Sequence, residues 1–197
     1  MFTEILVRYD EIALKKRNRG WFEGLLLNNM KSAMSDIGRA YKFRGRMAVE
    51  IKGPEFIDEA VKRLSFIPGI SSFSPAFKLP LDASFEEIVE KSLVLCREAL
   101  EEKRDTIKVI CRRSNKKYPG TSIEIQKQLA EGVLSRMQGL FKVSMKDYDF
   151  ALEIEIDTSG IFLFSKRIDG IRGLPAGCAG EFLSLLSGGI DSPVASF

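Results

Sequence analysis

The stretch Tyr148-Asp-Phe-Ala-Leu-Glu-Ile-Glu-Ile156 places apolar residues at every second position, with mostly acidic residues between them. Because successive side chains of a strand point to opposite faces, this alternation predicts a half-buried strand. The turn Asp157-Thr-Ser-Gly160 then leads into a second apolar run, residues 161–165, which is predicted to be the partner strand of a hairpin. The hairpin closes a unit that begins near residue 82.

The residues before the hairpin predict a helix, a strand and a second helix. Ser84 with Glu87, and Thr121 with Glu124, each have the spacing of a capping box, which marks a helix start. The strand expected between these helices covers residues 106–111, and a polar loop over residues 112–119 follows it. Residues 82–166 therefore have the predicted order αβαββ.

The first 77 residues predict a different unit. Strands are expected over residues 5–9, 41–43, 47–51 and 70–77, and helices over about 18–37 and 54–66. This βαββαβ order is the split βαβ, or ferredoxin-like, pattern. Residues 78–82 are expected to link the two units, and Trp21 is expected to pack at a helix start. The fold class is therefore α+β.

Composition excludes several classes of protein. The 197 residues include no apolar run near the roughly 20 residues that cross a bilayer, and the N-terminus lacks signal-peptide order, so we expect a soluble cytoplasmic protein. The three cysteines, Cys96, Cys111 and Cys178, are too far apart for a zinc site and do not suggest a disulfide framework. The absence of histidine excludes a Ser-His-Asp triad within this chain.

Basic residues gather in three clusters although the net charge is only +3. A charge run is usually a solvated face, but three runs at turns or loop tips, beside Tyr41, Phe43 and Tyr118, favour RNA. Lysine and arginine bind phosphates, and aromatic rings can stack on unpaired bases. The candidate RNA-binding residues are Lys15, Lys16, Arg17 and Arg19 in the first cluster, Arg44 and Arg46 in the second, and Arg112, Arg113, Lys116 and Lys117 in the third.

A predicted phosphate loop lies near the C-terminus. The apolar run Phe182–Leu186 reads as a buried parallel strand, and Ser187-Gly-Gly-Ile-Asp-Ser192 leads from it into a helix with Pro193 at its first turn. Glycines let the backbone approach a phosphate, and the free N–H groups of a helix start favour its charge. The lysine-bearing Walker pattern is absent.

These patterns resemble a known family. The loop resembles the SGGxDS loop of ATP pyrophosphatases, which split ATP between the α- and β-phosphates, and residues 82–166 resemble the THUMP RNA-binding domain. Their order, with Asn18-Arg-Gly20 and Arg172-Gly-Leu-Pro175, is similar to the tRNA 4-thiouridine synthetase (tRNA uracil 4-sulfurtransferase) family. The implied domains are ferredoxin-like (1–77), THUMP (82–166), a linker (167–181) and the start of a doubly wound ATP pyrophosphatase domain (182–197).

The resemblance implies a nucleotide site and a reaction. ATP would contact Leu185, Leu186, Ser187, Gly188, Gly189, Asp191 and Ser192, and Asp191 would hold Mg²⁺. ATP would adenylate O4 of the uridine at tRNA position 8, and sulfur from a persulfide-donating sulfurtransferase of the cysteine desulfurase type would displace AMP, giving 4-thiouridine. The sulfur-handling cysteine of the family lies beyond the loop, so no catalytic residue is expected within this chain.

The resemblance also implies what the chain needs for activity. We expect the rest of the ATP pyrophosphatase domain to come from a second chain or from a longer polypeptide, and a homodimer is a further candidate assembly. A family link to thiamine biosynthesis is not addressed by these residues. Two alternatives stay open, namely a stand-alone THUMP-type RNA-binding module without catalysis and a different ATP pyrophosphatase that acts on a small molecule.

Overall fold

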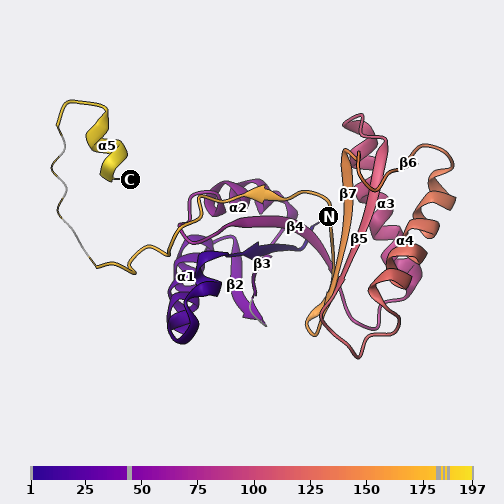
Figure 1. The fold of residues 1–197 in the computed structure, drawn as a ribbon, viewed down its shortest axis with the longest axis horizontal. Coiled ribbons are helices and arrows are strands. Elements are labelled where there is room, and N and C mark those ends of the chain that lie inside the picture. Colours follow the sequence, from indigo (N-terminus) through magenta and orange to yellow (C-terminus); the bar gives the residue numbers. More distant parts are fainter. Residues whose placement is uncertain (1, 44–45, 181–182, 184, 186, 197) are drawn as a thin grey trace.

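The computed structural model describes residues 2–43, 46–180, 183, 185 and 187–196 (Figure 1). Elements of the first half are β1 (Glu4–Arg8), the short 3-10 turns η1 (Glu11–Leu14) and η2 (Lys16–Asn18), α1 (Arg19–Met34), β2 (Gly38–Phe43), β3 (Arg46–Ile51), η3 (Pro54–Phe56), α2 (Ile57–Leu64) and β4 (Ser72–Leu79). Those of the second half are α3 (Phe85–Glu101), β5 (Thr106–Arg113), α4 (Ser122–Met137), β6 (Lys142–Val143), β7 (Phe150–Asp157) and β8 (Gly160–Phe164). The strand β9 (Ile168–Asp169) and the helix α5 (Asp191–Ser196) follow.

One mixed sheet runs through both halves. Its strand order is β2-β3-β1-β4-β8-β7-β5-β6, and β9 also pairs with β4. The first half is antiparallel, with β1 between β3 and β4, whereas β5 lies parallel to β7. The two halves join where Phe77–Leu79 of β4 pair with residues 161–163 of β8. The α+β class is confirmed, and the strand β4 belongs to both halves.

The helices of both halves pack on the same face of this sheet. On β4, Phe73 lies in the core with residues of α1 and α2, and Phe77 lies in the core with residues of α3 and α4. Ala76 points to the opposite face, where it packs with Leu6, Ala48 and two phenylalanines of β8. We call this opposite face, to which Ala76 and Leu6 point, the inner face of the sheet. It carries the polar groups described below.

The strand pairing beside β4 contains a bulge. Phe77 pairs with Leu163, but Phe73 pairs with Ile168, so the chain opposite β4 has one residue more between these two positions than β4 has. Such an extra residue bends a strand and redirects its side chains. Arg167 lies in this bulged segment and reaches the inner face.

The capping boxes in the sequence correctly predicted where α3 and α4 begin. Both predicted capping boxes form, with Glu87 N donating to Ser84 Oγ and Glu124 N donating to Thr121 Oγ1. Within the expected linker, residues 167–181, the stretch 168–176 runs along the first half. Gly170 N donates to Ser71 O at 3.0 Å, and Arg172 N donates to Ile70 O at 2.8 Å. Farther on, Asn29 Nδ2 on α1 donates to Ala176 O at 3.1 Å, so this segment is held against the domain.

The C-terminal strand prediction falls largely outside the described residues, because Phe182, Ser184 and Leu186 are not described. Leu183 and Leu185 lie in no strand and are 91% and 86% exposed, which differs from the expected buried strand. A parallel strand is buried only when other strands flank it and helices cover it, and the described part of the chain supplies neither here.

Within the described part of the chain, no helix has the length and apolarity that a bilayer crossing requires. Cys96, Cys111 and Cys178 are all free thiols, and burial raises the pKa of Cys96 to about 12. A thiol with so high a pKa is inert at neutral pH, which fits the core-packing role expected for it.

Candidate nucleic-acid interface

The first basic cluster lies on the two short turns between β1 and α1. Lys16 and Arg17 are exposed there, and Lys16 adopts a φ of 40°, which turns the chain sharply. Lys15 Nζ lies 5.4 Å from the centre of the Phe22 ring, and Arg19 Nε donates to Glu23 Oε1 at 2.8 Å. Two of the four cations are thus anchored to the domain, while Lys16 and Arg17 extend into solvent.

Glu23 on α1 is the buried anchor of this cluster. Its carboxylate accepts hydrogen bonds from Arg19, from the Tyr9 hydroxyl and from Lys42 of β2. Burial alone would raise the pKa of Glu23, but the bonds from Lys42, Tyr9 and Arg19 outweigh it and lower the pKa to about 2. Burial, followed by the bond to Glu23, raises the pKa of Tyr9 to about 12. The network fixes the start of α1 against the strand β2.

The second cluster lies on the β2–β3 hairpin. Arg44 lies outside the described residues. Arg46 begins β3 and reaches across to the second half of the molecule, where it forms an ion pair with Glu155 of β7. The aromatic residues of this hairpin are engaged within the protein: the Tyr41 hydroxyl donates to Glu4 Oε2 at 3.0 Å, and Phe43 stacks on Phe162 with ring centres 5.7 Å apart. Base stacking by these two rings would require them to leave those contacts.

The third cluster begins with the last two residues of β5 and continues into the loop after it. Arg112 Nη1 lies 3.3 Å from Glu155 Oε1 and 3.4 Å from Glu153 Oε2. Arg113 Nη1 donates to the carbonyl oxygens of Asn115, Lys116 and Tyr118, the last at 2.8 Å, and thereby shapes the loop. Lys116 and Lys117 are exposed at its tip. The loop therefore presents two lysines on a turn that an arginine holds.

A chain of contacts joins all three clusters. Arg19 and Lys42 share Glu23; Lys42 is on the same hairpin as Arg46; and Arg46 and Arg112 share Glu155. The sheet therefore brings together cations that are far apart in the sequence. The clusters are visible in the sequence, but the contacts that connect them depend on the fold.

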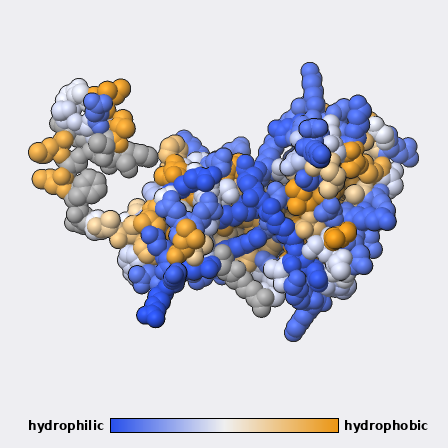
Figure 2. All heavy atoms as spheres, in the orientation of Figure 1, coloured by the Kyte–Doolittle hydropathy of each residue, from blue (hydrophilic) through white to orange (hydrophobic). Residues whose placement is uncertain are grey.

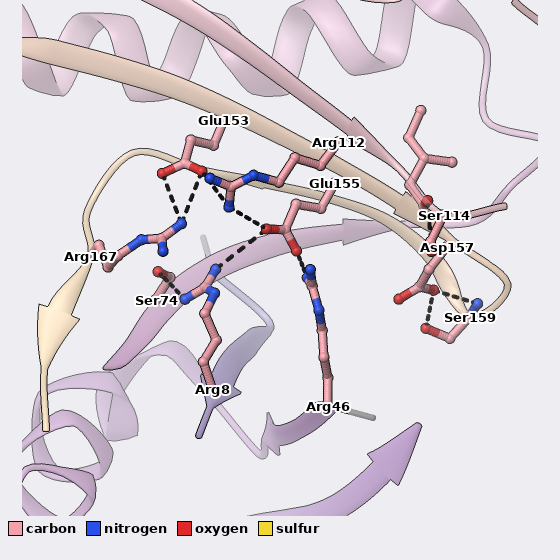
Figure 3. Close-up of polar contacts among 11 residues, drawn as sticks. Arg8, Arg46, Ser74, Arg112, Ser114, Glu153, Glu155, Asp157, Ser159 and Arg167 are labelled. Carbon is pink, nitrogen blue, oxygen red and sulfur yellow. Dashed lines mark hydrogen bonds and ion pairs between the residues drawn. The ribbon is translucent and has the colours of Figure 1, made fainter. Parts of the chain in front are cut away.

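Two arginines of the same network were missed. Arg8 on β1 places Nη2 3.7 Å from Glu155 Oε1 and donates from Nη1 to Ser74 Oγ at 3.0 Å. Arg167, in the bulge, places Nη2 3.1 Å from Glu153 Oε2. Figure 3 shows Arg8 and Arg46 rising from the first half toward Glu155, while Arg112 and Arg167 approach Glu153. Arg8 has no basic neighbour in the sequence, and Arg167 is adjacent only to Lys166, so neither belongs to one of the three clusters.

The acidic residues of β7 are buried rather than solvent-facing. Glu153 and Glu155 are only 7% and 3% exposed because the first half of the molecule covers the inner face beside them. The sequence predicted that the acidic face of this strand is exposed to solvent, and that part of the prediction was wrong. Four guanidinium groups share these two carboxylates, and the surplus positive charge points to binding of an anion.

One exposed aromatic residue belongs to the first cluster. Trp21 is 56% exposed, with its ring edge-on to that of Phe22 at 4.8 Å between centres. The expectation that Trp21 serves only packing was therefore incomplete. Its exposed face lies at the start of α1, which follows Lys16 and Arg17 directly, and Figure 2 shows an extended hydrophilic surface on the same half of the molecule.

The SGGxDS loop leads into a helix as predicted, although α5 begins at Asp191, two residues before Pro193. Ser187 Oγ and Ser192 Oγ are 2.7 Å apart, Gly189 N donates to Ser187 Oγ at 3.3 Å, and α5 begins at Asp191. A Cβ added at Gly188 would meet no described atom within 4 Å, so a phosphate could approach the backbone there. In the described residues Asp191 is not part of a group of three potential metal ligands. Hydroxyl and N–H donors suit a phosphate, while Leu185 is exposed and Leu186 lies outside the described residues.

Comparison with known families gives matches to both halves. The ThiI ferredoxin-like domain family matches residues 4–74, and the THUMP domain family matches residues 82–166. The chain is 40% identical, over 198 aligned residues, to a probable tRNA sulfurtransferase of Listeria monocytogenes, and the alignment covers 100% of this chain and 48% of that protein. The chain thus spans about half the length of the curated relatives it matches.

Solved structures agree with these matches. A 4-thiouridine synthetase solved as an RNA complex with bound ATP superposes with a TM-score of 0.84 at 33% identity, covering 100% of this chain and 49% of that one. The protein PH1313 from Pyrococcus horikoshii gives a TM-score of 0.77 at 32% identity and covers 89% of this chain and 57% of its own. The chain therefore consists mainly of a ThiI ferredoxin-like domain followed by a THUMP domain, and it is similar along its whole length to probable tRNA sulfurtransferases.

Proposed function

We propose that the chain is the tRNA-binding portion of an ATP-dependent tRNA sulfurtransferase, which adenylates uridine at position 8 and replaces its O4 by sulfur to give 4-thiouridine. The observation that carries this proposal is the fit of the whole chain to a 4-thiouridine synthetase solved with RNA and ATP. The ferredoxin-like and THUMP matches support the same conclusion. A role in tRNA modification also agrees with the cytoplasmic location expected from the sequence.

In this proposal, two kinds of basic residue contact the RNA. Lys16, Arg17, Lys116 and Lys117 are exposed and reach phosphates directly, which supplies the salt-dependent part of the affinity. Lys15, Arg19, Arg46, Arg112 and Arg113 are held by rings, carboxylates or carbonyl groups and present charge at fixed positions. Arg44, which lies outside the described residues, is proposed as a further RNA contact of the second cluster. Pre-positioned cations lose little entropy on binding, so they favour an RNA of matching shape.

The nucleotide site is proposed at the loop. Ser187, Gly188, Gly189 and Ser192 supply hydroxyl and backbone N–H groups to the pyrophosphate end of ATP, and backbone atoms of Leu185 and Leu186 lie beside adenine. Asp191 holds Mg²⁺, whose charge offsets that of the phosphates. The observed contact between the two serine hydroxyls and the N–H bond at Gly189 support this placement. No catalytic residue is assigned within this chain.

Turnover needs further partners. The rest of the ATP pyrophosphatase domain is supplied by a second chain or by further residues of a longer polypeptide, since a doubly wound sheet needs about 100 or more residues in addition to a strand and a loop. A persulfide-donating sulfurtransferase supplies the sulfur. A second copy of this chain is a further candidate partner.

Binding of tRNA at increasing salt tests the first part of the proposal. With about six phosphates engaged, affinity falls about a thousandfold between 50 and 200 mM salt. An ATP pyrophosphatase that acts on a small molecule would show no such binding. Adding the remaining ATP pyrophosphatase domain tests the second part: restored AMP formation with tRNA supports the sulfurtransferase, whereas unchanged RNA binding without AMP leaves a stand-alone THUMP-type module.

A further inference from the structure

The junction of the two halves contains more positive than negative side chains in a small space. Arg8, Arg46, Arg112 and Arg167 all form ion pairs with only two carboxylates, those of Glu153 and Glu155 (Figure 3). With Arg113 and Asp157 beside them, the junction holds five guanidinium groups and three carboxylates. Like charges at this separation repel one another, so a further anion would stabilise the arrangement.

Arg8 shows most clearly that a counter-charge is lacking. Its guanidinium lies at the junction of the two halves, 4.9 Å from the centre of the Phe164 ring. Its Nε is buried and has no hydrogen-bond partner among the described residues. Burial, and then the nearby charges of Arg167 and Arg46, lower the pKa of Arg8 to about 9. Arg8 therefore remains charged at neutral pH but is poorly compensated.

A hollow opens at this junction toward solvent. Its volume is about 170 Å³, and its walls include Arg46 from the first half with Arg112, Arg113 and Ser114 from the second. Glu155 and Asp157 also line it, and Asp157 Oδ1 is already bonded to Ser159 N and Oγ, both at 2.6 Å. The hollow is smaller than the roughly 300 Å³ of usual small-molecule pockets, so its size suits one tetrahedral oxyanion better than a nucleotide.

We propose that this hollow is a binding site for a single phosphate group, gripped by Arg46 and Arg112 and supported from behind by Arg8 and Arg167. The side chains of Arg46 and Arg112 belong to different domains, so the bound phosphate ties the two domains together. Guanidinium groups suit this role because they give paired donors to phosphate oxygens. The identification of the occupant as a phosphate of the RNA backbone rests on the proposed function; the site itself does not.

Thermal unfolding of the full chain in sodium phosphate and in sodium chloride, at equal ionic strength, tests the site. Phosphate should raise Tm of the unchanged protein by several degrees. Arg112→Gln and Arg46→Gln should each lose at least half of that rise. The matched control is Arg39→Gln, at an exposed arginine on β2 paired with Glu50, which should retain it. Because phosphate also stabilises proteins by exclusion from their surface, an equal rise in all four proteins overturns the proposal.

Circular dichroism in chloride establishes that each variant is folded. Should Arg46→Gln or Arg112→Gln fail to fold, calorimetric titration of the unchanged protein with inorganic phosphate decides instead. Saturable one-to-one binding supports the site, and the absence of saturable binding up to tens of millimolar overturns it.

Binding of tRNA in the same two buffers identifies the source of the phosphate. If the RNA backbone fills the hollow, phosphate weakens tRNA binding severalfold more than chloride does, and Arg112→Gln removes the difference. If only free phosphate enters, tRNA affinity is the same in both buffers while the Tm shift persists. If the chain binds no tRNA but phosphate still raises its Tm in an arginine-dependent way, the phosphate site stands and the proposed function is rejected. If the chain binds tRNA but phosphate gives no such rise in Tm, the proposed function stands and the phosphate site is rejected.

Discussion

Arg8 on β1 and Glu155 on β7 face each other across the two halves of the molecule, with Nη2 3.7 Å from Oε1. Glu155 also pairs with Arg46 and Arg112, so one buried carboxylate serves arginines from three strands. Its ion pairs with Arg8 and Arg46 connect the THUMP half to the ferredoxin-like half. The junction is both a structural contact and a part of the candidate RNA-binding surface.

Substituting Glu155→Gln removes the buried charge that three arginines share, so these arginines repel one another without compensation. We expect a loss of about 3–5 kcal/mol in the free energy of unfolding, because breaking a buried ion pair from one side leaves the other charge uncompensated. Urea denaturation measures it. Glu50→Gln removes an exposed carboxylate that pairs with Arg39, and it should cost at most about 1 kcal/mol. Equal losses of unfolding free energy in the two variants would show that the buried carboxylate of Glu155 stabilises the protein no more than the exposed one of Glu50.

Acid should weaken the anchor of the first basic cluster. The pKa of Glu23 is lowered from 4.5 to about 2, so its contribution is fully present above pH 4.5 and is lost as pH falls toward 2. The difference in unfolding free energy between the unchanged protein and Glu23→Gln should reach up to about 3 kcal/mol at pH 7 and shrink below pH 4.5. Denaturant titrations over this pH range measure the difference. A difference that stays constant with pH would contradict the ionised network.

The exposed cations of the first cluster should govern affinity for tRNA. The double change Lys16→Ala with Arg17→Ala removes up to two phosphate contacts, so the slope of log affinity against log salt should decrease by about 1–2. Fluorescence of Trp21, the single tryptophan, reports binding directly because the ring is exposed beside the cluster.

Lys31→Ala with Lys62→Ala is the matched control for this experiment, since both lysines are exposed on the helices α1 and α2 and belong to none of the three clusters. The control should leave the salt slope unchanged. A tRNA affinity that responds equally to both double variants would mean that binding follows total charge rather than this surface.

A side chain at Gly160, in the turn between β7 and β8, should lower the stability of the protein. Gly160 has a φ of +152°, and a Cβ there would lie 2.8 Å from Leu79 O of the strand β4. Gly160→Ala should therefore destabilise the protein by about 1–3 kcal/mol and loosen the pairing of β4 with β8. Gly20→Ala on α1 has free space and a helical backbone, so it should leave stability unchanged or raise it by up to about 1 kcal/mol. Hydrogen exchange at Phe77–Leu79 measures the loosening.

Local signals predicted much of the fold and of the basic surface. The capping boxes at Ser84 and Thr121 and the hairpin after Tyr148 depend on residues close in the sequence, and all of them form. The pairing of β4 with β8 is a contact between distant segments, and no local pattern encodes it. Arg8 and Arg167 were missed for the same reason: only the sheet brings them to Glu153 and Glu155. The acidic side of β7 was read as exposed because the sequence does not reveal what covers it.

Continuity of β4 through both halves has a mechanical consequence. Residues 72–76 of β4 pair with β1 and residues 77–79 pair with β8, so one continuous strand carries the main-chain pairing of both domains. The exposed cations of the two halves, Lys16 and Lys117 among them, are therefore displayed from one shared backbone. An RNA that contacts both halves must bring phosphates to both places, so its folded outline contributes to recognition.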